Sequence, residues 1–161
     1  MNSNDTSALV NYANLKRDLN KIDDALKLYE KAFNINKNHE TLLINYAGAY
    51  QIAGEFEKSK NILKLLHKNF PNNIIAHKLY SSINSYEIND EHQKVMLDKV
   101  NEANISKNDE ITLLFAIAKS FSDQKNHEKS AEFFIKANEA KFSSFDKYNF
   151  NSEIKLFNKI E

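Results

Sequence analysis

The sequence predicts an all-α protein, an α-solenoid built from repeated helix pairs. Three observations predict this fold. Among 161 residues, glycine occurs twice and proline once, which is too few turn-forming residues for a many-turned sandwich or barrel. Apolar residues recur at spacings of three and four, as on one face of a helix. The whole pattern then returns after 34 residues, which indicates that the helices form repeats.

The internal repeat extends over complete units. A shift of 34 positions places Leu9 on Leu43 and Asn11-Tyr12-Ala13 on Asn45-Tyr46-Ala47. We expect one domain over residues 1–161. Its repeats are expected at residues 6–39, 40–73, 74–110 and 111–141.

The apolar pattern of each of the first two units predicts two antiparallel helices joined by a tight turn. In the first unit the apolar blocks at residues 9–13 and 22–32 are separated by Asn20 and Lys21. Gly54 occupies the same turn in the second unit, where a helix end commonly needs a left-handed residue. Pro71 then supplies a stop, and the asparagines after it supply a cap for the next helix.

These residues resemble the tetratricopeptide repeat (TPR) family, whose unit also has 34 residues. The family has a small residue where the two helices of a unit cross, and this position holds Ala13, Ala47, Ser81 and Ala118. The facing small position holds Ala25, Ser59 and Ser130. The resemblance covers about residues 6–141 and implies a right-handed solenoid of about four helix pairs.

The third unit is three residues longer than the others. Placing the extra residues near 87–89 turns Met96, Val100 and Ala103 toward the first helix of the unit, and we prefer this phase. Placing them after the second helix instead turns another set inward: Gln93, Leu97 and Val100.

After the fourth unit, residues 142–161 are expected to form a C-terminal capping helix, with Ile154, Phe157 and Ile160 on one stripe. The alternative is a connector into a following domain.

Residues 90–150 also resemble the TPR region that precedes the catalytic domain in bacterial TPR–sulfotransferase fusion proteins. The runs at 105–109, 114–119 and 126–130 carry this likeness. It implies that the chain is a piece of a bacterial protein whose catalytic domain is missing here.

The composition argues against an enzyme. Cysteine is absent, and the five histidines show no metal-binding spacing, so no metal ligand is predicted. His77 stands at an apolar repeat position, where we expect a partly buried histidine with satisfied hydrogen bonds. Two glycines cannot supply a loop that wraps a phosphate or sulfuryl group. We therefore expect no catalytic residue and no cofactor.

Charge and hydropathy exclude further partners. Twenty-two basic residues balance 22 acidic ones, which is not the footprint of a nucleic-acid-binding protein. No run of 18 apolar residues exists to span a membrane, and no targeting signal follows Met1. The sequence therefore predicts a cytoplasmic protein.

The TPR resemblance implies a protein- or peptide-binding groove along the concave face, lined by the first helix of each unit. The predicted groove residues are Val10, Asn14, Arg17, Ile44, Gly48, Gln51, Ile75, Lys78, Ser82, Phe115 and Lys119. Three of them are cations and none is an acid, which predicts a peptide with apolar anchors and a modest negative charge. Gly48 is expected to leave a gap where a bulky anchor enters. The alternative is an oligomerisation module, forming a homo-oligomer, or a spacer N-terminal to a sulfotransferase domain.

Overall fold

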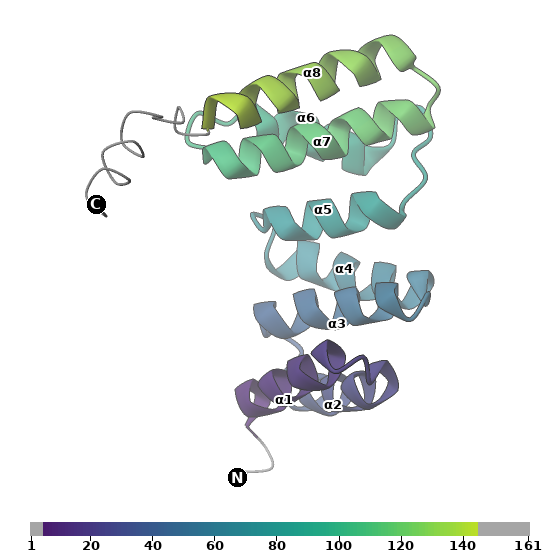
Figure 1. Ribbon diagram of the computed structural model, residues 1–161, viewed down its shortest axis with the longest axis vertical. Coiled ribbons are helices and arrows are strands. Elements are labelled where there is room, and N and C mark those ends of the chain that lie inside the picture. Colours follow the sequence, from purple (N-terminus) through teal and green to yellow (C-terminus); the bar gives the residue numbers. More distant parts are fainter. Residues whose placement is uncertain (1–4, 145–161) are drawn as a thin grey trace, which may run out of the picture.

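The computed structural model describes residues 5–144, which form eight helices and no strand. The helices are α1 (Thr6–Asp18), α2 (Ile22–Ile35), α3 (Glu40–Ile52), α4 (Phe56–Asn69), α5 (Ile74–Ile83), α6 (Glu91–Val100), α7 (Lys107–Asp123) and α8 (His127–Ser144). They stack in chain order from α1 and α2 at one end to α7 and α8 at the other (Figure 1). The all-α solenoid predicted from the sequence is confirmed.

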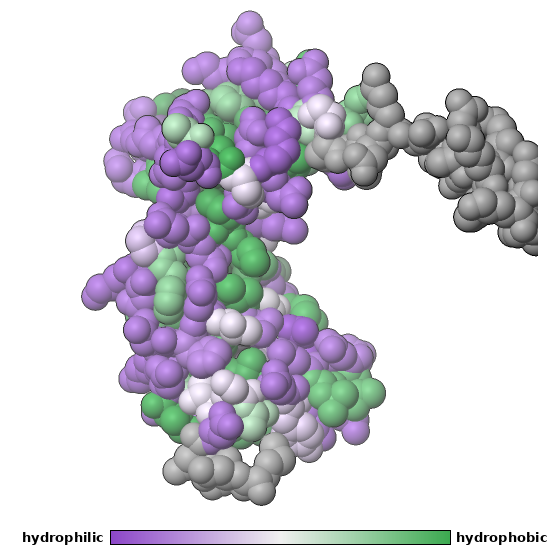
Figure 2. Space-filling model, turned by 90° about the vertical axis from the view of Figure 1, so that its left-hand side faces the viewer, coloured by the Kyte–Doolittle hydropathy of each residue, from purple (hydrophilic) through white to green (hydrophobic). Residues whose placement is uncertain are grey.

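The stack bends into a crescent. Helices α1, α3, α5 and α7 form a row nearest the viewer in Figure 1. After the turn by 90°, this row lies along the hollowed right-hand side in Figure 2, where apolar and polar side chains alternate. The first helices of the units therefore line the concave face.

All four helix pairs have a left-handed residue before their second helix. Asn20 has φ 57°, Gly54 has φ 75°, Asn89 has φ 68° and Lys125 has φ 59°. Two residues later the second helix of the pair begins in each case. The left-handed role predicted for Gly54 is confirmed, and two asparagines and a lysine fill it elsewhere. The predicted cap after Pro71 is also present, because the Asn73 side chain accepts a hydrogen bond from the Ala76 amide at 2.8 Å.

Small residues allow the helices of a pair to cross closely. In the first pair Ala13 and Ala25 are both fully buried. In the second, the Ser59 hydroxyl donates to the Ala47 carbonyl at 2.9 Å. In the last, Ser130 donates in the same way to Ala118 at 3.0 Å. These are the small positions that the TPR resemblance identified.

The third pair is built differently. A loop at 84–90 joins α5 to α6, and the backbones of these two helices stay further apart than in the other pairs. Helix α5 packs on α4 and α7, whereas α6 packs on α7. Met96 is fully buried, but it packs mostly against α7 rather than α5, and Gln93 of the alternative phase is buried as well. The preferred phase is wrong for Ala103, which lies beyond the end of α6 and is exposed, because α6 stops at Val100.

The ends of the last pair extend beyond the expected unit. Helix α7 begins at Lys107, one turn before the expected start at residue 111. Helix α8 continues through Ser144, past residue 141. The predicted capping helix, with Ile154, Phe157 and Ile160, lies outside the described residues.

The apolar core is divided along the stack. One part joins α1, α2 and α3, and a second joins α3, α4 and α5. The remaining parts lie between α6, α7 and α8. Where α4 and α5 face α6, the space is filled by the aromatic rings of histidines and tyrosines. No helix within residues 5–144 is long and apolar enough to cross a membrane.

Candidate functional site

A groove of about 260 Å³ lies between α5 and α7 on the concave face. Its lining includes four of the predicted groove residues, Lys78, Ser82, Phe115 and Lys119. The two helices approach closely because Ser81 is small, and its hydroxyl donates to the Ala116 carbonyl at 3.3 Å. The structure therefore brings together residues 33 or more positions apart in a single groove, as the repeat pattern implied.

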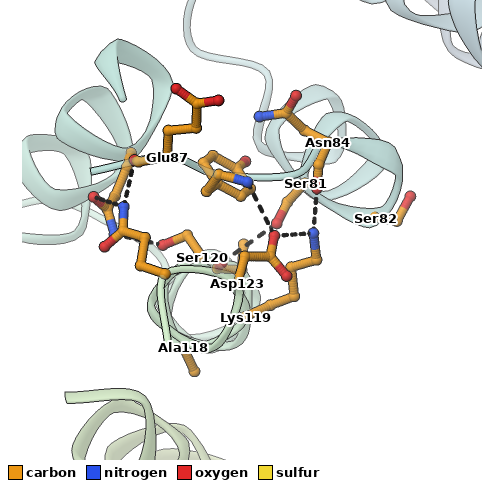
Figure 3. Close-up of polar contacts among 12 residues, drawn as sticks. Ser81, Ser82, Asn84, Glu87, Ala118, Lys119, Ser120 and Asp123 are labelled. Carbon is orange, nitrogen blue, oxygen red and sulfur yellow. Dashed lines mark hydrogen bonds and ion pairs between the residues drawn. The ribbon is translucent and has the colours of Figure 1, made fainter. Parts of the chain in front are cut away.

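The Lys119 amine is occupied within the protein. It donates to the Asp123 carboxylate at 2.5 Å and also to the Asn84 carbonyl. The same carboxylate accepts the Tyr86 amide at 3.2 Å (Figure 3). Lys119 and Asp123 thus anchor the 84–90 loop to α7. Lys119 was expected to face a ligand as a free cation, and this pairing neutralises it.

A second set of hydrogen bonds holds α6 and the loop to α7, beside the first (Figure 3). The Gln124 amide donates to the Glu87 carbonyl at 2.7 Å and to the Gln93 side chain at 3.0 Å. Gln93 in turn donates to the buried Ser120 hydroxyl at 2.8 Å. Sequence analysis missed this network, because its members sit on three different elements and form no motif.

In the N-terminal part of the predicted groove, the predicted residues are engaged within the protein. Val10 is 2% exposed and belongs to the core between α1, α2 and α3, so it is not a groove anchor. Arg17 pairs with Asp18 at 3.2 Å and donates to Asn45 at 3.3 Å. Asn14 accepts the Tyr29 hydroxyl at 2.5 Å. These groups hold helices together.

The central part is more open. Ile44 is half-buried against the α3–α5 core, whereas Ile75 is 51% exposed. A side-chain carbon placed on Gly48 would meet no atom within 4 Å, so space is open beside it. Gln51 bridges α3 to α5 by donating to the Leu79 carbonyl at 3.0 Å.

Lys78 differs from the other two predicted cations. Within residues 5–144 its amine has no hydrogen bond or ion pair, and its side chain is exposed at the rim of the α5–α7 groove. The positive character of the groove therefore rests on Lys78, because acids outside the predicted positions neutralise Arg17 and Lys119.

Away from the groove, three histidines gather between α4, α5 and α6. The ring centroids of His67 and His77 are 4.6 Å apart, and each lies 5.1 Å from that of His92. His77 Nδ1 lies 3.0 Å from His92 Nε2, and the Tyr86 hydroxyl lies 2.7 Å from His92 Nδ1. Sequence analysis identified no metal ligand, yet one ring nitrogen from each histidine lies within 4.8 Å of the others.

Burial keeps these imidazoles neutral. Desolvation lowers the pKa of His67, and desolvation together with the neighbouring histidines lowers the pKa of His77 to about 4 and of His92 to about 3. Nε2 of His67 and Nε2 of His77 are buried without a hydrogen-bond partner. An unsatisfied buried polar atom costs about 1–3 kcal/mol. The expectation that His77 is satisfied is therefore wrong for this atom.

One sequence signal could have revealed this cluster. His77 stands where the other units have Leu9, Leu43 and Leu114. A histidine in place of a core leucine needs partners, and the long loop of the same unit brings His92 within reach. The spacing of the three histidines along the chain carries no such information.

Comparison with known family models gives a match to part of the chain. The family model described as tetratricopeptide repeat matches residues 16–83. The match runs from the end of α1 through α5. A search of curated proteins gives no match.

Solved structures share the fold. "MamA 41-end from Desulfovibrio magneticus RS-1" is 17% identical, with a TM-score of 0.70 over 89% of this chain and 79% of that one. "YrrB: a TPR protein with an unusual peptide-binding site" is 14% identical, with a TM-score of 0.52 over 86% of this chain and 88% of that one. At these identities the likeness concerns the fold alone.

Proposed function

We propose that this TPR chain is a non-catalytic module that binds a peptide or a protein segment in the groove between α5 and α7. The observation that carries the proposal is the convergence of Phe115 and Lys78 at this groove on the concave face, with Ile75 exposed one turn before Lys78 on α5. YrrB, a protein of similar fold, is described as having a peptide-binding site. The module works in the cytoplasm and needs neither a cofactor nor nucleic acid.

The groove favours a ligand with an apolar anchor and a single acidic group. The anchor packs on Phe115 and reaches the open space beside Gly48, while the acid pairs with Lys78. Buried anchors dominate binding energy, whereas an exposed charge mainly tunes the association rate. The positive charge available to the ligand is smaller than the three predicted cations imply, because two of them are paired within the protein.

The test is selection of peptides from a random library on the wild-type chain, followed by affinity measurements on variants. Phe115→Asp should weaken the selected peptides at least about tenfold, or about 1.4 kcal/mol. Ile135→Asp, the same change at an exposed α8 residue outside the groove, should leave the affinity unchanged. Equal effects of both variants on peptide affinity would show that the groove is not the binding site.

The charge is tested with a second matched pair. Lys78→Glu should slow association in a salt-dependent way, and Lys64→Glu on exposed α4 surface should not. Identical rates in the two variants would remove Lys78 from the site.

A second candidate function is assembly, either as a homo-oligomer or as a spacer beside a sulfotransferase domain. The observation that favours it is the exposed apolar surface of α8, where Ile135 is 58% and Phe142 82% exposed. Sedimentation of the full chain tests it. If copies associate through α8, Ile135→Asp with Phe142→Asp should yield monomers, and an unchanged sedimentation coefficient would contradict this function.

A further inference from the structure

We infer that His67, His77 and His92 form a binding site for one zinc ion, which links α4 and α5 to α6. This site is separate from the groove and does not depend on the proposed peptide binding. Zinc is the expected metal because imidazole nitrogens suit it, and three histidines leave a fourth position for water.

The spacing of the three rings suits a tetrahedral ion. Zinc–nitrogen bonds of about 2.0–2.1 Å separate the ligand nitrogens by about 3.3 Å. His77 Nδ1 and His92 Nε2 are already 3.0 Å apart. All three ligand atoms lie within 4.8 Å of one another, so a closure of at most about 1.5 Å completes the triangle. Rotation of the His67 side chain on the last turn of α4 can supply that closure.

The hydrogen bond between His92 and Tyr86 favours the metal-ready tautomer of His92. His77 Nδ1 then donates to His92 Nε2, so zinc binding requires the His77 proton to move from Nδ1 to Nε2. If the Tyr86 oxygen accepts from His92 Nδ1–H at 2.7 Å, His92 Nε2 carries a lone pair directed at His77. Metal-bound histidines usually donate their second ring N–H in this way, which fixes the ring orientation. His67 Nε2, buried without a partner, supplies a third lone pair. Packing of neutral rings alone would leave this atom unsatisfied.

The charges around the cluster permit a bound cation. Lys99 is the cationic residue that acts on His77, but its amine lies 3.4 Å from the Glu102 carboxylate and 3.0 Å from Asn72.

The position of the site assigns it a structural role. The α5 and α6 backbones lack the close crossing that joins the other helix pairs, and the histidines occupy that gap. A metal bridge there would replace the missing crossing and couple the two halves of the solenoid. Zinc should therefore slow amide hydrogen exchange in α6 and raise the melting temperature.

Zinc titration of the untagged 161-residue chain, followed by calorimetry, tests the site. We expect one zinc per chain and no response to magnesium, which prefers oxygen ligands. His67→Gln, His77→Gln and His92→Gln should each lower zinc affinity about 100-fold or more, and Tyr86→Phe about 10- to 100-fold. His127→Gln, at an exposed position, is the matched control and should bind as the wild type does.

A measurement without mutations covers the case in which a variant fails to fold. Ring-nitrogen NMR of the wild-type chain should show zinc-induced shifts for three of its five histidines, with His39 and His127 unmoved. The inference is overturned if zinc moves none of the three, if it moves all five alike, or if a folded His77→Gln variant keeps wild-type affinity.

Discussion

Lys119 and Asp123 lie one turn apart on α7 and form an ion pair of 2.5 Å, and both hold the loop that follows α5. Lys119 donates to the Asn84 carbonyl, and Asp123 accepts the Tyr86 amide. Each charge therefore satisfies a backbone group of the 84–90 loop as well as its partner. The pair restrains that loop and neutralises a cation at the edge of the proposed groove.

Asp123→Asn should destabilise the protein by about 1–2 kcal/mol, because it removes the charge from both hydrogen bonds and keeps the side-chain shape. It should also release the Lys119 charge and strengthen binding of acidic peptides. Urea unfolding and peptide titration measure the two effects. Asp98→Asn, at an exposed residue without an ion pair among the described residues, is the control and should change neither quantity.

Alanine substitution at the two glycines should change the stability of the protein in opposite directions. Gly48→Ala should stabilise the protein by about 0.5–1 kcal/mol, because the added carbon meets no atom and alanine favours the helix. Gly54→Ala should destabilise it by about 1–2 kcal/mol, because φ is +75° there. Urea unfolding measures the free energy of unfolding of both variants. If both changes destabilise the protein, the inference of open space beside Gly48 is wrong.

The sequence predicts both Val10 and Ile75 as groove anchors. Their substitution by alanine should have different effects on stability and on peptide affinity. Val10→Ala should lower the free energy of unfolding by roughly 2 kcal/mol, since the side chain is 2% exposed in the core. Ile75→Ala should change stability by about 0.5 kcal/mol or less, since that side chain is 51% exposed. In peptide titrations only Ile75→Ala should weaken binding. A loss of affinity in a fully folded Val10→Ala variant would show that Val10 does contact the ligand.

Alkaline pH should unfold the protein through its buried tyrosines. Desolvation raises the pKa of Tyr29 and of Tyr46 above the ordinary value of 10, and the Tyr50 hydroxyl adds to the shift at Tyr46. A raised folded-state pKa contributes stability that is present below pH 10 and lost above it, by up to about 1.4 kcal/mol per pH unit for each group.

Urea unfolding between about pH 8 and 11 measures this dependence on the wild type and on Tyr46→Phe. The variant should lose part of the slope above pH 10. Tyr12→Phe, at a residue that is 42% exposed, serves as the control. Equal slopes in all three proteins would show that other groups govern the alkaline transition.

Local patterns in the sequence determined the helix pairs and most of their joints. The 34-residue period, the small residues at Ala47 and Ser59 and the turn at Gly54 act over a few residues or recur in every unit, so they can be read from the chain. The same patterns placed Lys78 and Phe115 on the concave face.

Only the tertiary structure decided which of these side chains remain available. Val10 is buried, Arg17 donates to Asn45 on α3, and Lys119 holds the 84–90 loop, because contacts between elements depend on the separation and rotation of the helices. The histidine cluster shows this most clearly. A few extra residues in the third unit separate α5 from α6, and three histidines from different helices fill that space. Sequence separation carries no information about such a meeting, whereas helical periodicity, being local, does determine each helix.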